Sequence, residues 1–438
     1  MLYEFFLRAI SILHRVGAAL LTLVILLLSL RLYIPNSADY AFDRVGPDVL
    51  PQLHFIGTAL RGGAGEQMQM LFPEGYFFTH ALYGLAWVEV GLRQPAGDPL
   101  HAQALQEARW ALEHLDSPDG KAPFSSTLDP PLGVFYVGWS SWLRGGVLKL
   151  QPADSRDPAE AAHFEADCAA LAQAFDRSPT PFLNAYPSQA WPVDSVVAVA
   201  ALRLHDTLLP PRFGPTIDRW LRLARARLDP ATGLLPHRVD PATGQMQEGA
   251  RGSSQSIIAR FLVEIDPDWG REQYALFRRQ FVAPLLGVPG VREYPIGKVG
   301  SGDVDSGPLL NGLSASATVV TLGAAQVVGD RSMADPLIHA SEAVGLPMSW
   351  GDTKRYAFGL LPTGDAFLAW SKTARPWIAP PMASTLPPAT GGWWRFPSHG
   401  LALGLLALIW SPVWIRQLWK SRARTSRQWQ RPSLQAPT

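Results

Sequence analysis

The sequence predicts an all-α protein: an (α/α)6 toroid of alternating inner and outer helices, with short β-hairpins and a transmembrane helix at each end. Three observations lead to this prediction. The chain of 438 residues carries an apolar segment near each end, helical periodicity dominates the long stretch between them, and two kinds of helix alternate along that stretch. An internal alternation of this kind is typical of repeat architectures.

Two apolar segments lie near the ends of the chain. The first runs from Val16 to Leu30 and the second from about Leu401 to Ile415. A bilayer core requires about 20 mostly apolar residues, a length that each segment reaches with its flanking residues. A cleaved signal peptide is the alternative for the first segment, and a buried C-terminal helix is the alternative for the second. No clear small-residue cleavage site follows Leu30, which favours an uncleaved anchor.

Basic residues flank both apolar segments and predict their orientation. Arg8 and Arg15 accompany the first, and six Lys and Arg with no acidic residue follow the second, from Arg416 to Arg431. Basic residues beside membrane helices stay on the cytoplasmic side. We therefore expect the bacterial inner membrane as the location, with both termini cytoplasmic and the main domain extracytoplasmic. Tryptophans near the second segment would form an aromatic belt: Trp393, Trp394, Trp410, Trp414 and Trp419.

Composition limits the partners and the covalent links that we expect for the central domain. The net charge of +1 becomes negative once the six basic residues of the tail are set aside, so nucleic acid is not an expected partner. The single cysteine, Cys168, can form no disulfide within the chain and has the spacing of a buried residue on an amphipathic helix. The expected parts are an anchor (1–34), a linker (35–46), the toroid (47–375), a Pro-rich linker (376–398), a transmembrane helix (399–416) and a basic tail (417–438).

The alternation of helices supports the toroid. Helices of one kind are rich in small and aromatic residues, pack closely on all sides and belong inside, whereas helices with a charged stripe belong outside. Pro47–Arg61 would be the twelfth helix and close the ring. An irregular helical domain and a repeat solenoid are the alternatives. The inner kind is expected to begin near Glu74, Gly133, Pro192, Gly252, Pro308 and Tyr356.

The loops before the inner helices carry the candidate catalytic residues, since long loops with many polar side chains are usually functional. Asp303 and Asp305 are spaced i, i+2, so an extended segment would turn both carboxylates to one side. Asp305 or Ser306 would alternatively cap the helix expected from Pro308. A third metal ligand is not visible nearby, so we predict no metal site, and no cofactor.

Asp194 lies just inside the helix expected from Pro192. It could simply complement the helix dipole there. Alternatively, Tyr186 and Trp191 stack on a sugar ring while Asp194 acts as general acid or base, because a carboxylate beside aromatic residues has a raised pKa.

Further candidates come from a predicted hairpin and from other helix starts. The segments 233–239 and 245–251 flank a turn and read as two short strands, with His237 as a proton carrier. Arg251 stands at a helix start and could bind a carboxylate or pair with an Asp of the funnel. The remaining candidates for substrate binding are Glu74, Glu293 and Tyr294.

The helix pattern resembles the six-hairpin glycosidase superfamily. Residues 250–274, 292–297 and 303–318 also resemble a group of membrane-anchored bacterial toroids that is distantly related to linalool dehydratase/isomerase. The resemblance covers about residues 45–375 and implies a toroid whose funnel acts on glycans or small alcohols. The linalool enzyme uses a pair of cysteines, whereas Cys168 stands alone on an outer-type helix, so no catalytic residue carries over.

These observations predict a membrane-anchored extracytoplasmic enzyme that acts on a glycan or glycoconjugate. A carboxylate pair across the funnel, Asp194 with Asp305 or Asp303, would activate water. One alternative is a lyase or isomerase on a small apolar alcohol, and another is a non-catalytic binding or assembly subunit of an envelope polysaccharide system. The sequence leaves the oligomeric state open.

Overall fold

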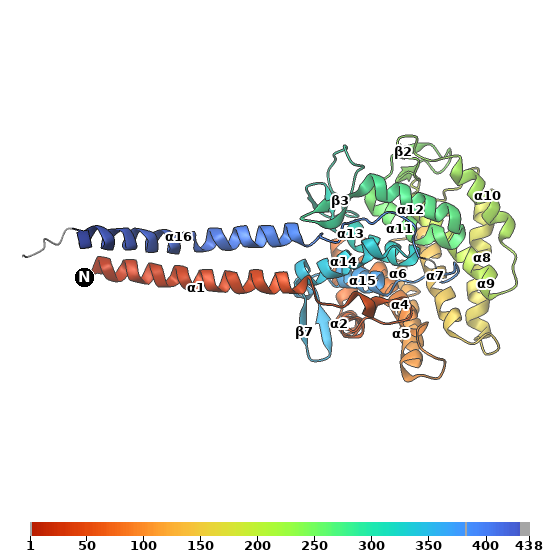
Figure 1. Ribbon diagram of the computed structural model, residues 1–438. Coiled ribbons are helices and arrows are strands. Elements are labelled where there is room, and N and C mark those ends of the chain that lie inside the picture. Colours follow the sequence, from red (N-terminus) through yellow and green to blue (C-terminus); the bar gives the residue numbers. More distant parts are fainter. Residues whose placement is uncertain (1, 382, 430–438) are drawn as a thin grey trace, which may run out of the picture.

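The computed structural model describes residues 2–381 and 383–429. The protein is mostly helical, as predicted, with three small antiparallel sheets among the described residues. Two long helices, α1 (Leu2–Arg31) and α16 (Phe396–Trp429), project side by side from a helical body (Figure 1).

The two projecting helices are largely exposed and pack on one another. Segments Ala9–Arg31 and Phe396–Trp419 are long and apolar enough to cross a membrane, by length and composition. Trp410 Nε1 donates to Thr22 Oγ1 at 2.9 Å, and the Tyr33 hydroxyl bonds His399 Nε2 at 2.7 Å. The described ends of both helices therefore lie far from the body, on the same side (Figure 1). Residues 430–438 of the expected basic tail lie outside the described residues.

The expected aromatic belt is incomplete. Trp393, Trp414 and Trp419 are exposed. Trp394, in contrast, is buried against Leu32 and Ala343, where the linker meets the end of α1. It packs inside the protein, because the linker folds back onto the body at that point.

Six helices of the small-and-aromatic kind contact one another in sequence order, and the last contacts the first, which closes a ring. Small residues make the close approach possible. A Cβ on Gly138 would lie 3.1 Å from the backbone nitrogen of Ala198 on the next helix of the ring. The six are α4 (Gly75–Gly91), α7 (Gly133–Leu150), α9 (Pro192–Leu208), α11 (Gly252–Ile265), α13 (Ala315–Val328) and α15 (Pro362–Thr373).

Helices with a charged face pack outside this ring, each against an inner helix. Cys168 is fully buried on one of them, as expected. Two short helices, α3 (Ala64–Leu71) and α6 (Pro118–Lys121), and two 3₁₀ turns, η1 (Ser37–Tyr40) and η2 (Ala357–Gly359), complete the helical elements. The outer helices are α2 (Val49–Arg61), α5 (Pro99–Leu115), α8 (Pro158–Arg177), α10 (Gly214–Arg225), α12 (Pro267–Phe281) and α14 (Arg331–Val344).

Short strands occupy the loops. The predicted hairpin is present, with Arg238 opposite Glu248 in register. A second sheet has the order β3-β4-β6-β5, and a third pairs β7 with β8. The strands are β1 (Arg238–Val239), β2 (Met246–Glu248), β3 (Val282–Leu285), β4 (Val288–Arg292), β5 (Leu309–Leu310), β6 (Leu313–Ser314), β7 (Met348–Trp350) and β8 (Thr353–Arg355).

Two inner helices begin later than predicted. Helix α13 begins at Ala315 and not at Pro308, because β5 and β6 form a tight turn through Asn311 and Gly312, both with positive φ. Ser314 caps this helix by accepting from the backbone N–H of Ala317, so the alternative capping role of Asp305 or Ser306 is wrong. Helix α15 likewise begins at Pro362, after the turn η2.

Candidate functional site

The first turns of the inner helices bring several predicted side chains to one end of the ring. Glu74 precedes α4 and accepts a short hydrogen bond from the hydroxyl of Tyr186. Asp194 lies in the first turn of α9, and its pKa responds to the charges of both Asp305 and Glu74. Carboxylates from α4, α9 and the loop before α13 are therefore close enough to act on one another. We call these residues, with Arg251 and its partners, the carboxylate cluster.

Asp194 is a buried member of the carboxylate cluster. Its residue is 4% exposed, and its carboxylate forms no hydrogen bond of normal geometry among the described residues. Desolvation raises its pKa well above the usual value, and the negative charges of Asp305 and Glu74 raise it further. The Trp139 indole lies close enough to oppose this rise slightly, although its N–H forms no hydrogen bond of normal geometry. Burial therefore favours the neutral, protonated form of Asp194.

Asp305 has a different environment. Its surface is accessible to solvent, yet protein atoms surround much of the carboxyl group. Desolvation, followed by the charge of Asp303, raises its pKa to about 6, while Arg251 opposes the rise. The cluster thus contains one carboxyl group whose burial favours the protonated form and a second with a pKa of about 6. Two neighbouring carboxyl groups in different protonation states are the usual arrangement for acid–base catalysis.

Arg251 connects the loops of the carboxylate cluster. Its Nε lies 2.7 Å from Glu293 Oε1, and its Nη1 lies 2.6 Å from Asp303 Oδ2. The Nη2 group is buried without a hydrogen-bond partner among the described residues. Tyr294 lies beside the guanidinium, whose Cζ is 5.3 Å from the centre of the ring. An unpartnered buried donor beside Asp303 is suited to bind an oxygen of a substrate.

Two of the predicted site residues, Glu293 and His237, form hydrogen bonds with other residues of the protein. Glu293 is fully buried and also accepts hydrogen bonds from the backbone and the hydroxyl of Ser253, at 3.1 and 2.7 Å. It therefore orients Arg251. His237 bonds the hydroxyl of Ser254 at 2.7 Å, and desolvation lowers its pKa to about 3. A neutral His237 fits a hydrogen-bonding role better than the predicted role of proton carrier.

Aromatic residues border the cluster. Tyr186 and Trp191 meet edge to face with ring centres 5.8 Å apart, and Phe124 stacks beside Tyr186 at 6.1 Å. Burial and the charge of Glu74 raise the pKa of Tyr186, so its hydroxyl remains a donor. Trp191 is only half-buried, which leaves part of its ring accessible. Accessible aromatic faces of this kind can stack on a sugar ring.

The sequence located most of the carboxylate cluster but not its internal bonds. Ser253 and Ser254, which hold Glu293 and His237, were not singled out, because serines near a helix start are common. Trp139 was not among the predicted site residues, because nothing in the sequence indicates that its indole N–H lacks a hydrogen-bond partner. Among the described residues, no group of three or more His, Cys, Asp or Glu side chains has the geometry of a metal site.

Comparisons with known proteins give a general result. No protein-family model and no curated relative matches the chain. Solved structures similar to the chain include the following two, both at low identity. A GH76 alpha-mannanase of Bacteroides thetaiotaomicron has 11% identity and a TM-score of 0.43 over 68% of this chain and 84% of its own. A D-mannose isomerase has 8% identity and a TM-score of 0.40 over 74% and 86%.

Proposed function

We propose that the chain is an (α/α)6 toroid held in a membrane by α1 and α16, with the toroid outside the cytoplasm. The closed ring of contacts and the outer helix against each inner helix support the toroid. The exposed apolar faces of the two projecting helices and the basic residues after Ile415 support the anchoring and its direction. This proposal keeps the parts of the chain that the sequence predicts, from the anchor (1–34) to the basic tail (417–438).

The function that the geometry supports best is hydrolysis of a glycan or glycoconjugate. In this mechanism Asp194 is the general acid that protonates the leaving oxygen, and Asp305 is the base that activates water. Arg251 binds a sugar oxygen through Nη2, and Trp191 stacks on the ring. The observation that carries the proposal is the burial of Asp194, 4% exposed in the first turn of α9, at the end of the ring where the charges of Asp305 and Glu74 act on its carboxyl group.

One observation favours a second candidate, a lyase or isomerase that acts on a small apolar alcohol. Phe78 packs edge-on against Trp139 with ring centres 5.4 Å apart, and it contacts Phe367 at 5.6 Å. Trp139, which acts on the pKa of Asp194, therefore belongs to an apolar group of rings. A neutral acid beside such a group could protonate a hydroxyl group and assist loss of water from a substrate that has no sugar ring.

The test uses the full-length protein in detergent micelles. It is incubated with a panel of mannose-containing and other envelope polysaccharides and, separately, with isoprenoid alcohols, and products are read by mass spectrometry. We expect new reducing ends from a polysaccharide with the wild type and with Asp154→Asn, an exposed carboxylate at the other end of α7, but not with Asp194→Asn or Asp305→Asn. A product from the alcohols alone would establish the second candidate. Turnover that survives both cluster variants would refute the mechanism.

A further inference from the structure

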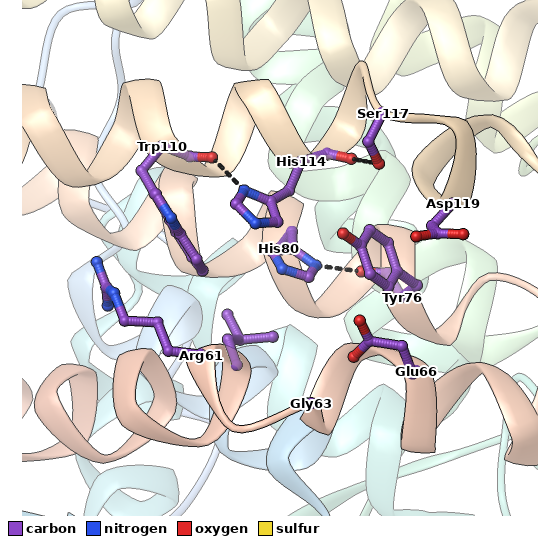
Figure 2. A pocket seen from close by; sticks show the side chains of 10 residues that line it. Arg61, Gly63, Glu66, Tyr76, His80, Trp110, His114, Ser117 and Asp119 are labelled. Carbon is purple, nitrogen blue, oxygen red and sulfur yellow. Dashed lines mark hydrogen bonds between the residues drawn. The ribbon is translucent and has the colours of Figure 1, made fainter.

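A pocket of about 570 Å³ lies between α4 and its outer neighbours α2, α3 and α5 (Figure 2). None of the residues that line it belongs to the carboxylate cluster. Two histidine rings form its inner wall, and the carboxylates of Glu66 and Asp119 stand on the side of Tyr76 (Figure 2). Pockets of about 300–1,000 Å³ commonly bind small molecules.

The two histidines present hydrogen-bond acceptors to this pocket. His80 and His114 are stacked, with ring centres 4.9 Å apart. Each uses Nδ1 on a backbone carbonyl one turn earlier, at 2.9 and 2.8 Å. A carbonyl can only accept, so each Nδ1 carries a proton. Burial lowers the pKa of His80 to about 4, so the Nε2 of this neutral ring has a free lone pair. His80 is 1% exposed, and its Nε2 has no hydrogen-bond partner among the described residues.

The unpaired charges at the pocket are negative. Glu66 and Asp119 are exposed and form neither a hydrogen bond nor an ion pair with the described residues, yet both charges act on the hydroxyl of Tyr76. Arg61 is the cation at the rim, and Glu107 neutralises it at 2.7 Å. The pocket therefore offers lone pairs and negative charge with no free cation among its described lining residues.

We infer that this pocket binds a primary ammonium group carried on a body about the size of a sugar ring. An ammonium group has three N–H donors and one positive charge, which match His80 Nε2 and the carboxylates of Glu66 and Asp119. The Arg61 guanidinium already lies over the Trp110 ring, 4.3 Å from its centre, so Tyr76 is the lining ring that we expect to make a cation–π contact with the ammonium group. An amino sugar and a polyamine share this chemistry. The inference stands apart from the proposed hydrolysis, because the two sites share no residue.

The test is calorimetric titration of the full-length protein in micelles with four probes at neutral pH: glucosamine, N-acetylglucosamine, glucose and spermidine. The first three have the same ring, and only glucosamine carries an ammonium group. We expect glucosamine to bind at least tenfold more tightly than the two neutral sugars. Binding to the double variant Glu66→Gln/Asp119→Asn should fall at least tenfold.

Two controls separate this site from its surroundings. Glu113→Gln removes a charge from the same helix as His114, but on an exposed face outside the pocket, so binding should be unchanged. Asp194→Asn should also bind normally, whatever its effect on hydrolysis. Spermidine that binds while glucosamine does not would identify a polyamine as the occupant. Equal binding of all three sugars, unchanged binding to the double variant, or no binding of either amine would overturn the inference.

Discussion

The two ends of the inner ring both hold buried carboxylates, but they differ in how those carboxylates are partnered. At the C-terminal ends of α4 and α11, Glu264 accepts three backbone N–H groups from residues 377–379, at 2.7–2.9 Å. Glu89 pairs with Arg260 at 3.1 Å and accepts from the Trp377 indole at 3.0 Å. At the N-terminal ends, Asp194 has no hydrogen bond of normal geometry among the described residues.

Burial raises the pKa at both ends of the ring. The pKa of Glu264 is about 7, although its three N–H donors oppose the rise. A raised pKa therefore does not distinguish a site from a structural cluster. Unpartnered polar atoms also occur at both ends, since Glu89 Oε2 and Arg251 Nη2 each lack a hydrogen-bond partner among the described residues. The distinguishing feature is the pairing of the carboxylate itself: Glu89 pairs with Arg260, and Glu264 fixes the segment after α15. Asp194 has no ion pair of this kind within the part of the chain that the structure describes. A buried polar group without a partner costs stability and is often retained for function.

The largest expected effect is a loss of activity when a carboxylate at the N-terminal end of the ring is replaced, with no such loss at the C-terminal end. With the substrate found by the panel, Asp194→Asn should lower kcat by about 10²–10⁴-fold, because it removes a general acid. Glu264→Gln should leave kcat per folded molecule near the wild-type value. Steady-state kinetics, with the folded fraction measured by circular dichroism, gives both numbers. Equal losses in the two variants would show that the ends do not differ in function.

The second prediction tests the structural end. Arg260→Met should lower the free energy of unfolding by about 3–5 kcal/mol, because it leaves Glu89 buried without its main counter-ion. Urea denaturation in micelles checks this. Arg279→Met, an exposed position on α12, is the matched control and should have little effect. A small effect at Arg260 would mean that Arg93, 3.6 Å from Glu89, is a sufficient counter-ion.

A smaller loss of kcat/KM is expected when Arg251 is replaced. Arg251→Lys keeps the charge but cannot bond Glu293 and Asp303 together with the geometry of a guanidinium. We expect kcat/KM to fall about 10–100-fold, since small displacements of positioned groups have effects of this size. Thermal stability measured alongside separates loss of positioning from loss of folding. An unchanged kcat/KM would remove Arg251 from the mechanism.

The pH dependence is the most gradual effect. Because Asp305 must be ionised to act as base, kcat/KM should rise with pH through about 6, the pKa of this group, and fall about tenfold per pH unit below it. Asp194 must stay protonated, so the rate should fall again at higher pH. Asp305→Asn should remove the acidic limb from any residual activity. A profile that is flat between pH 5 and 7 would contradict the assigned base.

The sequence predicted the helical order well because it depends on repeated local patterns. Gly133, Pro192 and Gly252 each mark the true start of an inner helix. The starts near Pro308 and Tyr356 were wrong, since tertiary pairing of Leu309 with Ser314 competes with the local helical pattern.

The candidate residues were found because polar side chains at the starts of inner helices converge when the ring closes. Their individual roles were less predictable. Whether Glu293 binds substrate or orients Arg251 depends on contacts between segments about 40 residues apart in sequence. The pocket at His80 was also missed, because its two histidines come from different helices, and His80 alone is indistinguishable from a core histidine.

The most direct test of the central claim is the stability of wild type and Asp194→Asn as a function of pH. Near pH 3 the carboxyl group is largely protonated in both the folded and the unfolded chain, so its ionisation contributes little difference. As the pH rises, the unfolded chain ionises while the raised pKa keeps folded Asp194 neutral, which costs the wild type about 1.4 kcal/mol per pH unit until its folded pKa is reached. Thermal melts should therefore show that Asp194→Asn gains stability relative to wild type between pH 3 and pH 7, and that it is the more stable protein at pH 7. A variant that is less stable than wild type at pH 7 would show that Asp194 is an ionised, structurally partnered residue, and would contradict its role as the acid.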